Sequence, residues 1–197
     1  MCPFPTERVS RLRPLMEAPE KARLVPRVLA GAGIRFVIVE HLSQTKMDGA
    51  ALCLDSTRLA IALSLRYPRM DYFWFTLLHE LAHIMEDDGE YADVDVIGSE
   101  EIDAIEKKAN EKAASWLVPP EKMESFITRT SPLYSESKIV GFARKIGVHP
   151  SIIVGQLKYR GELSWERFKR LQSVDVRSVI KESAVCDGWG NTIAIAE

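Results

Sequence analysis

The sequence predicts an α+β fold, in which helices dominate and a few strands form a small three-stranded sheet. Three short apolar segments lie close together between residues 34 and 63, and each has the length and composition of a strand. Helical 3.6-residue periodicity marks most of the chain before and after them. A cluster of strands followed by a run of helices is typical of the α+β class.

Four segments divide the chain in this prediction. Helices are expected in residues 1–32, a core with the sheet and a long helix in 33–120, and a helical subdomain in 121–172. Residues 173–197 carry no motif that predicts their structure, although a strand at 192–195 is one possibility.

The first helices and the strands have recognisable boundaries. Helical segments are expected at 6–16 and 19–31, because Pro14 and Pro19 interrupt the pattern. A turn at Asp55-Ser56 predicts that the second and third strands form a hairpin. The strands are expected at 34–39, 49–54 and 58–63.

The most informative stretch is His79-Glu80-Leu81-Ala82-His83, which lies in an apolar helical run. A helix places side chains at i and i+4 side by side, so His79 and His83 can bind one metal ion while Glu80 lies beside it as a base. The alternative is a chance motif on a purely structural helix. Burial of an imidazole without a partner is costly, so the pairing of two of the four histidines favours a zinc site.

A tetrahedral catalytic zinc site needs a third protein ligand and one open position. Glu106 is the candidate, because it opens a second helical pattern whose apolar residues share one inward face, and Glu106 is expected to lie on that face. Asn110 lies one turn further on and is expected to accept the free ring N–H of a ligating histidine. The competing carboxylates between the two helices are expected to be solvated in a connecting loop: Glu86, Asp87, Asp88, Glu90, Asp93, Asp95, Glu100 and Glu101.

The segment after Pro119-Pro120 is expected to be a helix-turn-helix-like subdomain, because Ala143, Gly147 and Ile153 occupy the small, turn and apolar positions of that motif. DNA binding is the alternative function for this pair of helices, but its second helix is apolar on too many sides to read bases. A hairpin that packs over the metal site is therefore favoured, and the charges at 158–170 are expected to form a solvated face. The helices are expected at 121–127, 136–146, 150–159 and 164–171.

The composition excludes several classes of protein. A net charge of −2 gives no bias toward nucleic acid or anionic membranes, and 46% hydrophobic residues suffice for one good core. No apolar run approaches the roughly 18 residues that a membrane span requires, and the first residues do not form a signal peptide. We expect a soluble cytoplasmic protein that does not bind membranes.

Two stretches carry a family resemblance: one runs from Phe75 to His83, and the other from Glu106 through Ala109-Asn110, Ala113-Ala114 and Leu117 to Pro119. They resemble the ImmA/IrrE family of bacterial zinc metallo-endopeptidases, and the similarity spans about residues 20–172. The resemblance implies a zincin-like, gluzincin-type catalytic core with His79, His83 and Glu106 as Zn²⁺ ligands and Glu80 as general base.

A finer resemblance concerns the residues ahead of the motif. Residues 48–51 and 62–74 look most like the version of the domain that is fused to HigA-type antitoxin regulators. The resemblance implies a protein substrate, often a transcriptional repressor, and leaves room for a toxin or regulator as partner. DNA binding by this chain alone is not expected.

Two functions remain open from the sequence. One is a zinc endopeptidase that cleaves a regulatory protein, and the other is a non-proteolytic zinc-binding regulatory module of antitoxin type that binds a protein or DNA. Glu80 favours the first, because a structural zinc site has no use for it and would close its fourth position. An oxyanion-stabilising donor is not identified, and the available side chains are Tyr91, Tyr134, His149 and Arg160.

Overall fold

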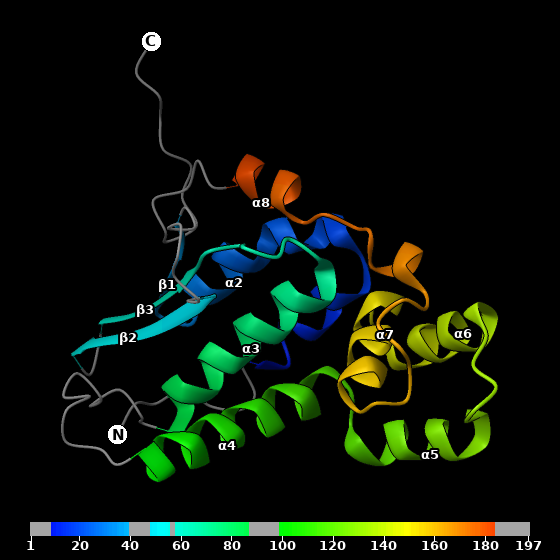
Figure 1. The fold of residues 1–197 in the computed structure, drawn as a ribbon. Coiled ribbons are helices and arrows are strands. Elements are labelled where there is room, and N and C mark those ends of the chain that lie inside the picture. Colours follow the sequence, from blue (N-terminus) through cyan, green and yellow to red (C-terminus); the bar gives the residue numbers. More distant parts are fainter. Residues whose placement is uncertain (1–8, 40–47, 56–57, 87–98, 184–197) are drawn as a thin grey trace.

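A computed structural model describes residues 9–39, 48–55, 58–86 and 99–183 of the chain, and Figure 1 shows their arrangement. A small sheet lies beside the long helix α3, a second long helix, α4, runs along α3, and α5, α6 and α7 gather at one end. The elements in order are η1 (Arg13–Glu17), η2 (Pro19–Leu24), α2 (Val25–Ala30), β1 (Ile34–Ile38), β2 (Gly49–Asp55), β3 (Arg58–Leu63), α3 (Met70–Glu86), α4 (Ser99–Leu117), α5 (Pro120–Thr130), α6 (Glu136–Ile146), α7 (Pro150–Tyr159), η4 (Lys169–Gln172) and α8 (Arg177–Ser183).

The three predicted strands form one mixed sheet in the order β1-β3-β2. β1 pairs with β3 in parallel, and β2 pairs with β3 as the predicted antiparallel hairpin. Alternate residues of β3 point into the core, since Leu59, Ile61 and Leu63 are all buried. β2 is left at an edge of the described sheet, next to α3.

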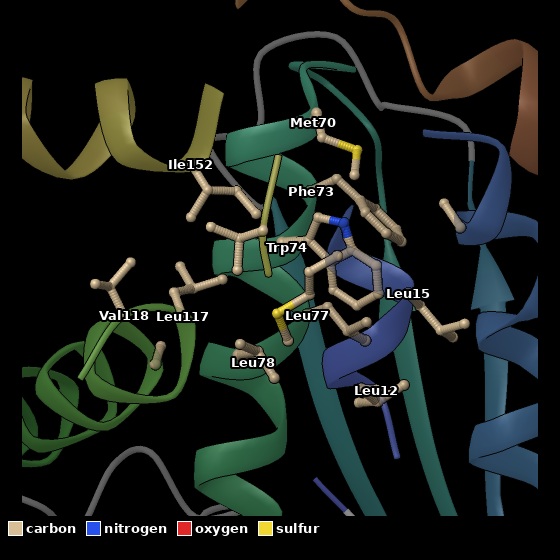
Figure 2. Close-up of a cluster of buried hydrophobic side chains, with 14 of the residues drawn as sticks. Leu12, Leu15, Met70, Phe73, Trp74, Leu77, Leu78, Leu117, Val118 and Ile152 are labelled. Carbon is tan, nitrogen blue, oxygen red and sulfur yellow. The ribbon is translucent and has the colours of Figure 1, made fainter. Parts of the chain in front are cut away.

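Helix α3 is the centre of the hydrophobic core. Phe73, Trp74, Leu77, Leu78 and Leu81 are fully buried, and a helix that is apolar on nearly every side must have neighbours on nearly every side. Figure 2 shows these neighbours, which come from the N-terminal segment, from the end of α4 and from α7. The labelled ones are Leu12, Leu15, Leu117, Val118 and Ile152.

The helices α6 and α7 have the predicted boundaries, and Gly147 ends α6 in the left-handed conformation with φ of 76°. Helix α7 does not have a free face for DNA. Seven of its ten residues are buried, whereas a recognition helix must expose side chains that reach base edges. Helix α7 packs instead against α3, and the expectation that the pair covers the metal site stays a prediction. The buried residues of α7 are Ser151, Ile152, Ile153, Val154, Gln156, Leu157 and Lys158.

A buried polar network joins α7 to the start of α3, and it corrects the expectation that the charges at 158–170 are all solvated. Lys158 is only 4% exposed, and its Nζ donates to the carbonyl of Trp165 at 2.9 Å and to Oε1 of Gln172 at 2.5 Å. Nε2 of Gln172 donates to Oδ2 of Asp71 at 2.7 Å, and Arg69 binds both oxygens of Asp71. Buried charges of this kind require such partners.

Other predictions for the ends of the chain were wrong in detail. The helix expected at 164–171 is absent, because Phe168 adopts a left-handed conformation and turns precede the short η4. The first helices are largely 3₁₀ rather than α. Residues 173–183, which had no predicted structure, belong to the fold, since Val176 and Ile180 are buried. The strand suggested at 192–195 and most of the acidic loop lie outside the described residues.

None of the helices in the described part of the chain has both the length and the apolar character needed to cross a membrane.

His149 generates a prediction about pH. It is the N-cap of α7, and its Nδ1 accepts a hydrogen bond from the amide of Ser151 at 3.2 Å. Burial lowers the pKa of His149, although the charges of Asp71 and Glu20 oppose that shift. The unfolded chain therefore binds a proton at higher pH than the folded protein does. As a result, the free energy of unfolding decreases as the pH falls below about 6.5.

The comparison variant is His149→Asn, which keeps an N-cap acceptor worth typically about 1 kcal/mol but does not titrate. We expect urea unfolding to show that the wild type loses stability below about pH 6.5 relative to His149→Asn. Parallel pH profiles for the two proteins would contradict this role.

Candidate metal centre

The two histidines of the motif lie one turn apart on α3, and α4 brings Glu106 against them. Nε2 of His79 lies 3.2 Å from Oε2 of Glu106, and Nε2 of His83 lies 3.3 Å from Oε1 of the same carboxylate. The two Nε2 atoms are 3.0 Å apart. Three potential ligand side chains from two helices thus converge on one point.

This geometry fits a zinc ion. Tetrahedral bonds of about 2.0–2.1 Å place neighbouring ligand atoms about 3.3 Å apart, which is close to the distance between the two Nε2 atoms and to the distance from each of them to the nearer oxygen of Glu106. Burial, together with the nearby His83, lowers the pKa of His79, and a neutral imidazole is the form that binds a metal. Within the described ranges, His79, His83 and Glu106 are the only histidine, cysteine or acidic residues that cluster closely enough to hold an ion.

The exposure of the three side chains shows where the site opens. The histidine side chains are 14% and 15% exposed, whereas that of Glu106 is 50% exposed. Buried Ala109 and Ala113 anchor α4 on the core, so Glu106 lies at the border of the predicted inward face rather than inside it. A ligand can therefore approach the cluster from solvent.

Glu80 lies beside the cluster but faces the sheet. It is only 7% exposed, and the backbone of Ala51 on β2 provides a hydrogen bond to its carboxylate. Burial above all, and then the charge of Glu106, raise the pKa of Glu80 to about 8, while the bond from Ala51 opposes the shift. A carboxyl group with this pKa can both take up and release a proton near neutral pH.

Gly49 makes room for Glu80, a requirement that the sequence analysis did not identify. A Cβ at this position would lie 2.5 Å from Oε1 of Glu80, and 2.9 Å from both its Cγ and Cγ2 of Thr76. Any other residue at position 49 would displace the carboxylate. A glycine at the start of a strand is a weak signal of such a close approach.

Asn110 lies one helical turn beyond Glu106. A hydrogen bond with Asn110 raises the pKa of His79, in opposition to the larger effect of burial. Nδ1 of His79 is nevertheless buried without a hydrogen-bond partner among the described residues. The role of Asn110 as the group that orients a histidine ligand therefore stays a prediction.

Three of the suggested oxyanion donors are engaged elsewhere. Tyr134 donates to Glu162 at 2.6 Å, His149 caps α7, and Arg160 pairs with Glu124. Tyr91 lies outside the described residues.

Comparison with known families identifies the domain. A family model described as the IrrE N-terminal-like domain, which is a peptidase family, matches residues 36–155. The chain belongs to this family. The match runs from within β1 to within α7 and includes β2, β3 and α3 to α6. The family is one of metallopeptidases, in agreement with the cluster of possible metal ligands. No curated protein matches the chain, and the finer similarity to HigA-type regulators stays a prediction.

Loss of Glu106 is predicted to weaken metal binding. We expect the purified protein to bind about one Zn²⁺ per chain. Removal of a group that only orients a ligand lowers metal affinity roughly 10- to 100-fold, and we expect Glu106→Gln, which removes a ligand itself, to lower Zn²⁺ affinity by more than that. Competition titration with a chromophoric chelator measures this change. The control is Glu111→Gln, an exposed carboxylate on the same helix. Equal affinities in the two variants would contradict the assignment of Glu106.

Proposed function

We propose that this protein is a zinc-dependent endopeptidase that cleaves a regulatory protein, such as a helix-turn-helix transcriptional repressor. The observation that carries the proposal is the convergence of His79, His83 and Glu106, with Glu80 adjacent to them but facing β2. Three ligands leave a fourth position open, which is the arrangement of catalytic rather than structural zinc sites. The identity of the substrate rests on the family resemblance alone.

Each residue has a distinct task in this proposal. A bound zinc ion supplies a Lewis acid that polarises a peptide carbonyl and acidifies a water molecule. His79, His83 and Glu106 hold the ion, and Asn110 orients His79. Glu80 takes the proton of the attacking water and transfers it to the leaving amine, a contribution of typically 10²–10⁴-fold.

The proposed substrate lies in extended form along β2. This strand is at an edge of the described sheet, and its residue Ala51 contacts Glu80. An edge strand offers unpaired backbone groups to which a peptide can add as a further strand. The peptide bond would thereby pass next to the base.

Glu80→Gln is predicted to separate metal binding from catalysis. The variant should bind Zn²⁺ as the wild type does and should cleave substrate at least about 10²-fold more slowly, because only the proton transfer is lost. Cleavage is followed by mass spectrometry, with repressors encoded near the gene and a quenched-peptide library as substrates. If both proteins bind Zn²⁺ and neither cleaves any of these substrates, the endopeptidase proposal is contradicted in favour of a regulatory module.

Gly49→Ala is predicted to impair cleavage without a change in any functional side chain. The added methyl group must displace the Glu80 carboxylate, so we expect kcat to fall while Zn²⁺ affinity stays close to that of the wild type. Gly141→Ala on α6 is the control, because a Cβ there meets no atom within 4 Å. Unchanged kcat in Gly49→Ala, measured on the best substrate of the preceding assay, would mean that the position of Glu80 is not critical.

A further inference from the structure

A cavity of about 400 Å³ lies between α3, α4 and α7. This volume is within the range of natural binding pockets, which is about 300–1,000 Å³. Residues of the metal-binding helices form one side, and residues of the helical subdomain form the other. None of the tasks proposed for the metal centre explains why such a space is kept open.

The cavity adjoins the metal centre on two helices. Asn110, which lines it, is one turn beyond Glu106 on α4, and Phe75, which also lines it, is one turn before His79 on α3. The rings of Phe75 and His79 lie 6.2 Å apart between centroids. At a rise of 1.5 Å per residue, the cavity starts about 6 Å from Glu106 along α4 and reaches Ala114 at about 12 Å.

The lining favours an apolar occupant with a flat side chain. Five aromatic residues contribute to it, and two of them, Tyr159 and Trp165, are 77% and 61% exposed. Exposed aromatic side chains at a concave site are typical of places where another molecule binds. The aromatic residues are Tyr67, Tyr72, Phe75, Tyr159 and Trp165.

The charges at the cavity are already neutralised. Arg69 binds Asp71 through two hydrogen bonds, and Arg160 pairs with Glu124. A charged occupant would have to give up its hydration without gaining a free counter-charge from either guanidinium, which is unfavourable. An uncharged occupant meets no such cost.

The wall formed by the helical subdomain is held in place before any ligand arrives. Buried Lys158 fixes the carbonyl of Trp165, and the same network reaches Asp71 on α3. Gly155 allows α7 to approach closely, because a Cβ there would lie 2.8 Å from Oδ2 of Asp71. A pocket that is formed in advance loses little entropy when it binds.

We propose that this cavity binds one large uncharged side chain of the substrate, preferably an aromatic one, and so selects the bond that is cleaved. The inference rests on the proposed function. An extended peptide advances about 3.3–3.6 Å per residue, so a side chain that enters the cavity belongs to a residue within about two positions of the scissile bond. The helical subdomain then serves substrate selection rather than DNA binding.

Methyl NMR tests binding without any need for cleavage. Alanine, leucine and isoleucine methyl groups are labelled in the full chain, and N-acetyl-tryptophanamide, N-acetyl-phenylalaninamide or N-acetyl-glycinamide is added at millimolar concentration. We expect saturable shifts at Ala114, Leu117 and Ile152, which line the cavity, with the two aromatic amides but not with the glycine amide. Absent shifts, or equal shifts with all three compounds, overturn the proposal.

A cavity-filling variant sharpens this test. Ala114→Phe should abolish the shifts at Leu117 and Ile152, whereas Ala104→Phe, an exposed position on the same helix, should leave them intact. If Ala114→Phe fails to fold, Trp165→Ala with Leu133→Ala as its exposed apolar control provides the same comparison. Binding that survives in both cavity variants also overturns the proposal.

The peptide library distinguishes failure of this inference from failure of the proposed function. If the wild type cleaves, we expect an aromatic residue at one position to raise kcat/KM about 10- to 200-fold over glycine, and Ala114→Phe to remove that preference. Cleavage without an aromatic preference overturns the substrate pocket but leaves the endopeptidase intact. Aromatic amides that bind the cavity of a protein that cleaves no peptide support the pocket and contradict the endopeptidase.

Discussion

The structure depends on one constraint: helix α3 must be buried on nearly every side and still present two imidazoles to the same point in space. Phe73, Trp74, Leu77, Leu78 and Leu81 fill the core around it. Interiors are packed as densely as crystals, so these contacts leave the helix little freedom to rotate or slide. The positions of His79 and His83 are therefore set by the hydrophobic core, and the carboxylate of Glu106 has only to be brought to them by α4.

The same helix determines the different environments of the acidic residues. Glu106 is half-exposed beside the histidines, whereas Glu80, on the side that faces β2, is buried. Burial raises the pKa of Glu80 to about 8, whereas the side chain of Glu106 remains accessible from solvent. The two carboxylates thus have different environments, which suit the different roles proposed for them.

Much of this could be predicted from the sequence, where the signal is local and periodic. The hairpin of β2 and β3, the bounds of α6 and α7, and the convergence of Glu106 with His79 and His83 follow from strand patterns, helix punctuation and i, i+4 spacing. The closeness of Glu106 to the histidines required only that the apolar faces of α3 and α4 meet.

The features that were missed depend on contacts between distant parts of the chain. Lys158 was expected in solvent because lysine is seldom buried, but Gln172 and the Trp165 carbonyl satisfy it. Turns that include the left-handed Phe168 take the place of a helix that periodicity favoured. The cavity between α3, α4 and α7, and the need for glycine at position 49, become visible only when these segments are placed side by side.

The central claim is that His79, His83 and Glu106 bind one zinc ion while Glu80 stays outside its coordination shell. A crystal structure of the zinc-loaded full chain, with anomalous diffraction at the zinc absorption edge, tests it most directly. The account predicts one strong peak bonded to both Nε2 atoms and to the Glu106 carboxylate, at about 2.0–2.2 Å, with the Glu80 carboxylate directed at a solvent molecule. A peak at other residues, or Glu80 bound as a fourth protein ligand, would contradict it.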